Sequence, residues 1–286
     1  MVDAGTEVFA MEELIPEDWR ISDDLWEGIA LFIPKHKNTH RFGGGRPRAP
    51  DRVCMEAILF VLRTGCQWKA LDATRFCPGS TAHDRFQEWV AAGVFQEMWE
   101  CGLLAWDEFK GIDWSWLSMD GCMTKAPLGG EKTGKNPTDR AKRGVKRSLL
   151  VEGQGLPIGL AVEGANRNDM KMVEATLESI PVERPKPTTE QPQGMCMDKG
   201  YDYDEVRELV AEFGFTAHIR SRGEEAKELK RKARAKARRW VVERTHSWMN
   251  RFRGILIRWS KKAENYIAML HMSFAFIIYR RMELFG

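Results

Sequence analysis

Three carboxylates in this chain stand out by their position. Asp120 follows the apolar run WLSM and is followed by Gly121, and Asp198 ends the short apolar run GMCM. Reacting groups of α/β sheets gather at strand ends, where neighbouring strands bring such residues together. Two aspartates placed close together without cationic partners repel each other, and a divalent metal ion between them makes the arrangement favourable. Asp120 and Asp198 are therefore candidate metal ligands.

The third carboxylate, Glu243, lies in the most basic part of the sequence. Residues 220–262 hold 16 Lys/Arg and 4 Asp/Glu, although the net charge of the whole chain is only +3. Glu243 is the one acid among eleven Lys/Arg of residues 232–262. Such a glutamate is expected on an ordinary solvated helix, where it pairs with Arg239 or Arg244. It is equally expected where a metal ion needs an anion and the surrounding cations bind phosphates.

A helical wheel of the segment around Glu243 is compatible with both interpretations. The face opposite Glu243, roughly 120–180° away, is apolar and predicts packing. That face holds Val241, Trp248, Phe252 and Ile255. Polar residues lie within about 60° of Glu243 on the same wheel, namely Arg239, His246, Ser247 and Asn250. The wheel permits a metal-binding role for Glu243 without requiring it.

Two neighbouring polar groups are interpreted as structural. Asp202 and Glu205 form an Asp-x-x-Glu pattern, which is typical of a capping box at the start of a helix. His246 lies near Glu243 on the wheel, but a lone histidine is more often a polar packing residue than a metal ligand. Neither group is assigned to the candidate site.

A set of two Asp and one Glu inside a basic region is suited to phosphodiester chemistry. Hydrolysis needs a water molecule activated at neutral pH and a stabilised leaving oxygen, and two Mg²⁺ ions roughly 3.5–4 Å apart provide both. Carboxylates are the oxygen ligands that Mg²⁺ prefers. The surrounding Lys and Arg neutralise DNA phosphates and position the strand. The pattern therefore favours a nucleic acid as the substrate.

The second half of the chain must position these acids, and its pattern predicts a mixed α/β region. Residues 111–125 predict a strand that carries the first aspartate, and two β-rich runs around Gly153–Gly155 predict a hairpin. Asp169 opens a helix, and a short strand ends at Asp198. A helix, a strand, the basic segment 220–262 and an apolar C-terminal helix complete the order.

The first part of the chain is predicted to be helical. Ser22 caps a short amphipathic helix, and the next apolar helix ends at Gly65. Ser80 is expected to cap a further helix that carries His83 and Arg85 near its start. Two helices across a tight connector suggest a helix-turn-helix-like DNA-binding region, although any small helical bundle has the same pattern.

Composition excludes several classes of protein. The six cysteines are widely spaced and form no CxxC pair, which predicts reduced thiols rather than a zinc knuckle or a disulfide framework. No run of about 18 apolar residues is present, and the acidic N-terminus has no signal-peptide pattern, so a soluble intracellular protein without a membrane segment is expected. One basic block in a nearly neutral chain indicates that a single region contacts an anionic polymer.

The acidic motifs together resemble those of DDE transposases of bacterial insertion sequences. The motifs are Asp120-Gly121, the sequence DKGYD at Asp198–Asp202, and RWVVERTHSWMNRFR around Glu243. They are most similar to the type named after insertion sequence five, which is related to the insertion-sequence-four group. The resemblance covers about residues 113–279, and a looser form extends over residues 20–105 through GGGRPR and TGCQWKAL.

The family signature is Tyr-x2-Arg-x3-Glu-x6-Lys, and this chain matches its centre. Arg239 and Glu243 stand at the Arg and Glu positions. Lys236 stands where the family has Tyr, and Asn250 stands where it has Lys, with Arg251 adjacent. These departures concern the two flanking roles, and the glutamate is unaffected.

The resemblance implies a fold and an activity. The expected fold is a ribonuclease-H-like mixed sheet in residues 111–286, with a helical, helix-turn-helix-like DNA-binding region in residues 1–110. Asp120, Asp198 and Glu243 are the implied catalytic residues and the ligands of two Mg²⁺ ions, for which Mn²⁺ is expected to substitute. The implied enzyme binds the terminal inverted repeats of its element, cleaves the ends by hydrolysis and joins the freed 3′-hydroxyl to target DNA.

The resemblance also implies partners. We expect double-stranded DNA at transposon ends and target sites, and a homodimer on DNA, in the bacterial cytoplasm and at the nucleoid while the enzyme acts. Candidate DNA contacts are Arg46, Arg48, His83, Arg85, Lys125, Lys146, Arg239, Arg244, Asn250, Arg251 and Arg253. Two alternatives stay open: a catalytically silent DNA-binding regulator, and a metal-dependent nuclease of the same fold without strand transfer.

Overall fold

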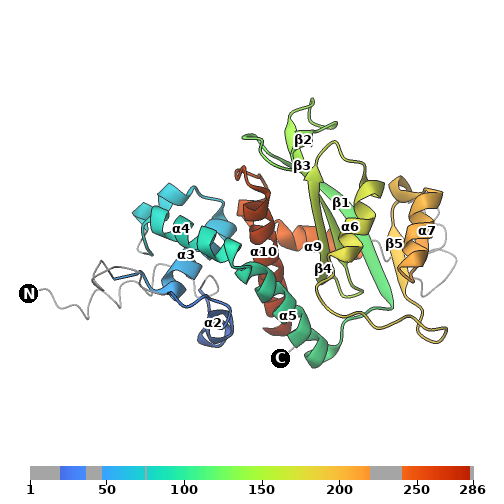
Figure 1. Cartoon of the computed structure of the whole chain (residues 1–286), viewed down its shortest axis with the longest axis horizontal. Helices are drawn as coiled ribbons and strands as arrows, with labels where there is room; N and C mark the ends of the chain where they lie inside the picture. Colours follow the sequence, from blue (N-terminus) through green and yellow to red (C-terminus); the bar gives the residue numbers. More distant parts are fainter. Residues whose placement is uncertain (1–19, 37–46, 75, 220–239, 284–286) are drawn as a thin grey trace, which may run out of the picture.

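The computed structural model describes residues 20–36, 47–74, 76–219 and 240–283. A mixed β-sheet lies at the centre of the second half, with strand order β2-β3-β1-β5-β6 and with β4 paired to β3 (Figure 1). The strands are β1 (Trp116–Lys125), β2 (Gly134–Lys135), β3 (Arg143–Val151), β4 (Pro157–Gly164), β5 (Gly194–Met197) and β6 (Thr216–Ile219).

The sheet combines an antiparallel half with a parallel half. Strand β3 runs antiparallel to both β1 and β4, and the turn between β3 and β4 contains Gly153–Gly155, so the predicted hairpin is confirmed. Strand β5 is parallel to β1, and β6 is parallel to β5. Three antiparallel strands followed by two parallel ones form the ribonuclease-H-like arrangement that the sequence predicted. The prediction of a mixed α/β fold is therefore confirmed.

Helices pack on both faces of this sheet. Helix α6 (Val173–Glu178) follows the short helix η3 (Asp169–Met172) and contacts β3 and β4. Helix α9 (Trp240–Met249) contacts β1 and β3 from the opposite face. Helix α7 (Asp204–Glu212) follows η4 (Lys199–Tyr201) and packs beside β6 at the far edge.

The first part of the chain is helical, as predicted. Its elements are α2 (Asp23–Ala30), α3 (Asp51–Thr64), η2 (Trp68–Ala73), α4 (Gly79–Ala91) and α5 (Val94–Lys110). The C-terminal helix α10 (Ala263–Glu283) packs along α5, and Figure 1 shows the two helices side by side between the N-terminal helices and the sheet. The rings of Trp99 on α5 and His271 on α10 stack at 4.8 Å between centroids. The N-terminal helices therefore share a core with the last helix of the chain.

Two of the three predicted helix ends in this region are confirmed. Ser22 caps α2 and accepts a hydrogen bond from the Leu25 amide, and Gly65 ends α3 in the left-handed conformation at φ 70°. The predicted cap Ser80 is wrong, because α4 already begins at Gly79. The Asp72 side chain accepts the Gly79 N–H at 2.7 Å, so a residue from η2 satisfies this helix start.

The predicted connector between α3 and α4 is also corrected. Residues 65–78 separate the two helices and include η2, and this is longer than the three- or four-residue turn of a helix-turn-helix. The predicted long helix around Glu243 ends at Met249. Phe252 and Ile255 therefore lie beyond the helix, in and before the short helix η5 (Arg253–Ile255), although both are buried as the wheel predicted.

Two predictions from composition can be compared with the structure. All six cysteines are free thiols, as expected. In the part of the chain that the structure describes, no helix is both long enough and apolar enough to cross a bilayer.

Candidate active site

The parallel pairing of β1 and β5 brings Asp120 and Asp198 together. In this register Ser118 is opposite Cys196, and each aspartate lies two residues further along its own strand direction. Side chains two residues apart along a strand point to the same face. Asp120 and Asp198 therefore leave the same face of the sheet at neighbouring positions, although Asp120 lies within β1 and only Asp198 follows a strand end.

Asp198 lies where β5 gives way to a tight turn. Its side chain caps the short helix η4 by accepting the Gly200 N–H at 2.7 Å. This hydrogen bond fixes the direction of the carboxylate, since one oxygen is held against the backbone of its own turn. Asp120 has no such turn because β1 continues to Lys125, and its side chain is 37% exposed.

Helix α9 is fixed to the sheet through the loop between β3 and β4. The Thr245 hydroxyl donates to the Gly155 carbonyl at 2.6 Å, and the Arg244 guanidinium donates to the Gln154 carbonyl. The buried carboxylate of Glu152 holds this loop by accepting the amide N–H groups of Asp113, Gln154 and Leu156. Burial raises the pKa of Glu152 to about 7, and the three N–H donors partly oppose that shift.

The anchored helix carries Glu243 one turn before a residue that approaches Asp120. His246 follows Glu243 by three residues, so the two side chains are neighbours on the surface of α9. The His246 Nε2 atom lies 3.9 Å from Asp120 Oδ2. Glu243 is exposed at the start of the helix, on the side that faces away from the buried residues Val242 and Thr245. Helix α9 therefore meets β1 beside Asp120 through His246, one turn away from Glu243.

His246 is neutral in this environment. Burial, followed by the nearby charge of Arg147, lowers the pKa of His246 to about 3. Its 3.9 Å approach to Asp120 is therefore not an ion pair at neutral pH. Neither ring nitrogen hydrogen-bonds to a described residue. Arg147 itself is buried on β3, opposite Cys122, with a guanidinium nitrogen 3.8 Å from the Cys122 sulfur. The site thus has a buried positive charge beneath the aspartates.

A second group of side chains supports the acid site from the other face of the sheet. A Cβ atom at Gly121 would overlap the Asp169 Oδ1 atom and would lie 3.6 Å from the Tyr201 hydroxyl. Lys146 donates to Asp169 Oδ2 at 2.8 Å and also to the Arg167 carbonyl. Burial raises the pKa of Tyr201 well above its usual value, and the charges of Asp169, Asp120 and Asp198 raise it further.

Sequence reasoning missed the role of Asp169 and Tyr201 beside the site. One signal was present: Gly121 directly follows the first aspartate, and a glycine at that point indicates that another group approaches the backbone closely. The predicted capping box is corrected as well. Tyr203 is the N-cap of α7, and Asp202 instead pairs with Arg207 at 2.6 Å, since these side chains meet across the helix start.

The acid site fits a hard divalent cation by its chemistry. Asp120, Asp198 and Glu243 supply carboxylate oxygens, which are the ligands that Mg²⁺ and Mn²⁺ accept. Within residues 20–36, 47–74, 76–219 and 240–283, no three His, Cys, Asp or Glu side chains are already gathered closely enough to hold an ion. The paired aspartates are thus the fixed part of the donor set.

Some of the predicted DNA contacts lie inside the protein. Arg85 is 4% exposed and pairs with Asp51, and Lys146 is 7% exposed and pairs with Asp169. His83 is half-buried, with its ring edge against Trp68. Each of these side chains has a structural role because its polar or aromatic surface is used within the fold.

Other predicted contacts are accessible. Arg48 pairs with Glu88 at 2.6 Å near the surface, and Lys125 is exposed near Asp139. Arg244 stacks on the rings of Trp240 and Trp248. The remaining exposed residues are Asn250, Arg251 and Arg253. Arg46 and Arg239, which were also predicted, lie outside the described residues.

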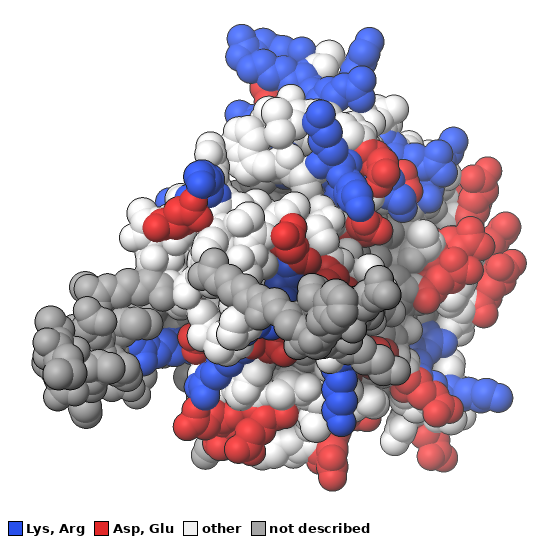
Figure 2. All heavy atoms as spheres, turned by 60° about the vertical axis from the view of Figure 1, so that its left-hand side comes forward, with Lys and Arg blue, Asp and Glu red and all other residues white. Residues whose placement is uncertain are grey.

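The loop around β2 is a basic surface that the residue-by-residue prediction did not include. The upper end of the molecule in Figure 2, where Figure 1 places β2, carries many Lys and Arg side chains. The exposed cations of this loop are Lys132, Lys135, Arg140, Lys142 and Arg143. The signal was visible in the sequence as a Gly-rich segment with an excess of Lys and Arg.

A ribonuclease-H-like sheet with paired aspartates and a helix-borne glutamate defines the class of nucleases and transposases of this fold. Family comparisons agree with it. Residues 21–99 match the family described as "Putative transposase of IS4/5 family", and residues 116–278 match the family described as "Transposase DDE domain". The second match covers more than half of the chain. The chain therefore belongs to the DDE transposases, and membership implies the use of a divalent metal ion.

Individual relatives point to the same family. The chain is 32% identical over 157 residues to the "Putative transposase for insertion sequence element IS402" of Burkholderia cepacia, which covers 54% of this chain and 72% of the relative. It is 34% identical over 118 residues to an "Insertion element IS402 uncharacterized 16.2 kDa protein" of the same organism, covering 41% and 80%. A solved piggyBac transposase synaptic complex with hairpin DNA is 12% identical, with a TM-score of 0.42 over 92% of this chain and 74% of that one. That structural similarity is too weak to support an argument.

Proposed function

We propose that this chain is the transposase of an insertion sequence, which cleaves the ends of its element and joins them to target DNA. One observation carries the proposal. The β1–β5 register sets Asp120 and Asp198 side by side on one face, and His246 of the hairpin-anchored helix α9, one turn after Glu243, lies 3.9 Å from Asp120. Membership in the DDE transposases supports the same assignment.

In the proposed mechanism, Asp120, Asp198 and Glu243 hold two Mg²⁺ ions, for which Mn²⁺ substitutes. Bound there, the ions would supply a water activated at neutral pH and stabilise the leaving 3′-oxygen. The two aspartates keep a fixed spacing because each is attached to a strand of the same sheet. Tyr201 stays protonated beside them because burial and three carboxylates raise its pKa.

The proposed DNA path uses exposed polar and positively charged side chains at the end of β1 and after α9. Lys125 ends β1, five residues beyond Asp120, and Asn250, Arg251 and Arg253 follow α9. The basic loop around β2 extends this surface, with Lys135 and Arg140 among its exposed cations. Such contacts neutralise phosphates and set the position of the duplex without reading its sequence.

The proposal assigns end recognition to residues 1–110 and catalysis to residues 111–286. Joining two ends requires two active sites, so the proposed enzyme acts as a homodimer on double-stranded DNA. A strand-transfer reaction with both ends on one plasmid and a crosslinking assay on the resulting complex measure this stoichiometry.

The test is a cleavage assay on supercoiled plasmid that carries the element ends, with Mg²⁺. We expect nicking at the ends and joined products in the presence of a target plasmid. Asp198→Asn should abolish both. Asp202→Asn is the matched control, because it removes a neighbouring carboxylate that pairs with Arg207. Equal cleavage by the Asp198→Asn protein would refute the assignment.

Two other outcomes identify the alternatives. Specific binding to the ends without any metal-dependent nicking indicates a DNA-binding regulator. Nicking without joined products, when a 3′-hydroxyl end and a target are both supplied, indicates a nuclease of the same fold.

A further inference from the structure

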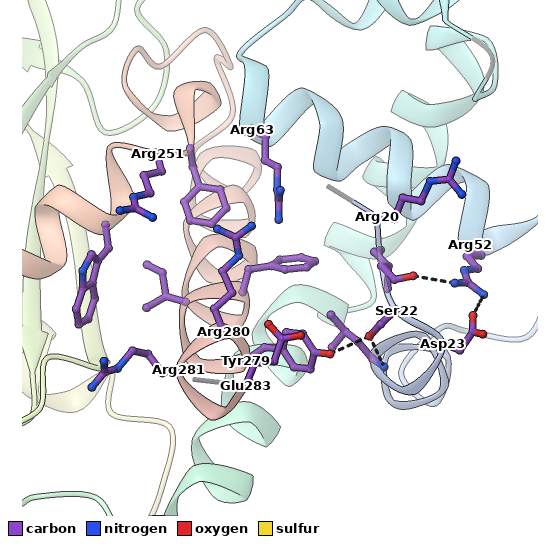
Figure 3. A pocket seen from close by; sticks show the side chains of 16 residues that line it. Arg20, Ser22, Asp23, Arg52, Arg63, Arg251, Tyr279, Arg280, Arg281 and Glu283 are labelled. Atoms are coloured by element: carbon purple, nitrogen blue, oxygen red, sulfur yellow. Dashed lines mark hydrogen bonds and ion pairs between the residues drawn. The ribbon is translucent and has the colours of Figure 1, made fainter. Parts of the chain in front are cut away.

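A large cavity lies between the N-terminal helices and the C-terminal part of the chain, away from the acid site. Its volume is about 1090 Å³, and its walls come from α2, α3, α10 and the segment that follows α9. We call it the arginine cavity because six arginines line it. They are Arg20, Arg52, Arg63, Arg251, Arg280 and Arg281. Figure 3 shows Arg63 and Arg280 pointing toward one another, with Arg251 on the other side of the cavity.

Positive charge exceeds negative charge among the lining residues. The carboxylates of the wall are Asp23 and Glu283. Asp23 pairs with Arg52 at 2.6 Å, at the edge formed by α2. Glu283 lies beside Tyr279 at the end of α10. The wall therefore presents more guanidinium groups than carboxylates, and such groups match phosphate geometry.

Part of this charge is withdrawn from water. Arg63 is only 9% exposed, at the last turn of α3, and it still lines the cavity. Charged groups in a water-poor setting bind an anion more strongly than exposed ones do. An anionic ligand in the cavity gains from this arrangement, since it meets cations that already have few water neighbours.

Aromatic rings line the same space. Trp248, Phe252, Phe276 and Tyr279 are part of the wall. The guanidinium groups of Arg244 and Arg281 lie over the Trp248 ring, at 4.8 and 5.4 Å from its centroid. The Trp248 ring is thus covered by guanidinium groups, and Phe252 and Phe276 are buried, so the rings form the floor of the cavity and the arginines are its polar groups.

We propose that the arginine cavity binds a short single-stranded DNA segment. This proposal rests on the proposed function for its biological setting. A cavity of this size is at the upper limit of ordinary ligand pockets, roughly 300–1,000 Å³, and it admits a few nucleotides of one strand rather than a duplex. Arg251 and Arg280 contact phosphates, and Arg63 supplies the buried charge.

The test measures binding of the full chain to a fluorescein-labelled ten-nucleotide oligothymidylate by anisotropy, in EDTA so that no cleavage occurs. The double variant Arg251→Gln/Arg280→Gln should bind at least tenfold more weakly than wild type in about 100 mM salt. Its plot of log affinity against log salt should be less steep by about 1.4, because each lost phosphate contact removes about 0.7. Affinity for a duplex of the same length should change less.

A matched control removes two positive charges at the far edge of the sheet. Arg207→Gln/Lys186→Gln alters α7 and the connector before β5, which lie away from the cavity, and it should leave the affinity within twofold of wild type. Thermal melting of each variant checks that the fold is retained.

Four outcomes overturn the proposal. The wild-type protein does not bind the oligonucleotide, or the double variant binds it as tightly as the control variant does. The double variant loses equal affinity for duplex and single strand, or millimolar inorganic phosphate displaces the oligonucleotide at constant ionic strength. The last two reassign the site to duplex DNA and to a small anion. Cleavage of plasmid ends is read separately, so failure of the cavity proposal leaves the assignment of Asp198 intact.

Discussion

The acid site and the arginine cavity are built in opposite ways. Asp120 and Asp198 are placed by hydrogen-bonded strands of one sheet, and their spacing follows from a register. Arg20 and Arg280 line one cavity although they lie at opposite ends of the chain. Strand pairing holds the two carboxylates at fixed positions relative to each other, as bond-breaking chemistry requires. The arginine cavity gathers charge without fixing single atoms, which suits a flexible polymer.

The largest expected effect separates catalysis from binding. Asp120→Asn should lower end cleavage by about a thousandfold, because several kcal/mol of charge stabilisation depend on the bound metal ions. Binding of single-stranded and duplex DNA in EDTA should be unchanged, since the cavity keeps its arginines. Cleavage rates and anisotropy on the same preparation measure both. A parallel loss of binding would show that the two regions are not separable.

An intermediate effect concerns the helix pair behind the cavity. Burial lowers the pKa of His271 to about 4 from an ordinary value of 6.5. Its neutral form therefore stabilises the fold above pH 6.5, and this contribution is lost as the pH falls toward 4. Between pH 7 and pH 5 the loss is about 2 kcal/mol.

His271→Phe keeps a ring against Trp99 and removes the titration. The difference in unfolding free energy between wild type and variant, from urea denaturation, should grow in favour of the variant as the pH falls from 7 to 5. The same pH dependence in both proteins would place the titrating group elsewhere.

A smaller effect tests the support behind the acid site. Gly121→Ala inserts a methyl group where Asp169 and Tyr201 approach the strand, and overpacking of this kind costs about 1–3 kcal/mol. Gly28→Ala makes the same chemical change in α2, where nothing lies within 4 Å. The control should be neutral or slightly stabilising. Melting temperatures of the two variants measure this difference in stability, and plasmid cleavage should fall only in the Gly121→Ala protein.

The smallest effect tests the wall of the cavity. The Tyr279 hydroxyl lies 2.8 Å from the Ser22 hydroxyl. Tyr279→Phe removes this contact and should cost no more than about 1 kcal/mol, because the bond is near the surface. Affinity for the oligonucleotide should drop about threefold or less. A larger drop would mean that the α2 wall positions the arginines more strictly than we infer.

The sequence indicated the acid site better than its surroundings for a physical reason. Asp120 and Asp198 each follow an apolar run, and β1 and β5 are neighbouring parallel strands, so local pattern and topology agree. Asp169 comes from a helix start whose partner, Lys146, lies on another strand, and no local spacing predicts that contact. Arg85 shows the converse, because its early position on a helix looked accessible and tertiary packing buried it against Asp51.

The fold was predictable to a similar degree. Two β-rich runs on either side of Gly153–Gly155 indicated the hairpin, and the order of strands and helices indicated the mixed sheet. Helix starts were harder to predict. At the start of α4, the backbone N–H of Gly79 donates to the side chain of Asp72, which lies outside the helix. The cavity could not be foreseen, since its walls meet only after α10 packs beside α5.

The contact between α5 and α10 has a consequence for how the protein is made. The ribosome releases α2 to α5 long before α10 exists, so Trp99 and its apolar neighbours lack their main packing partner until α10 emerges. Folding of these helices is therefore coupled to the synthesis of α10. A truncated product lacking α10 would keep Asp120 and Asp198 in its sequence, yet it would lack the scaffold that joins the chain's beginning to its catalytic half.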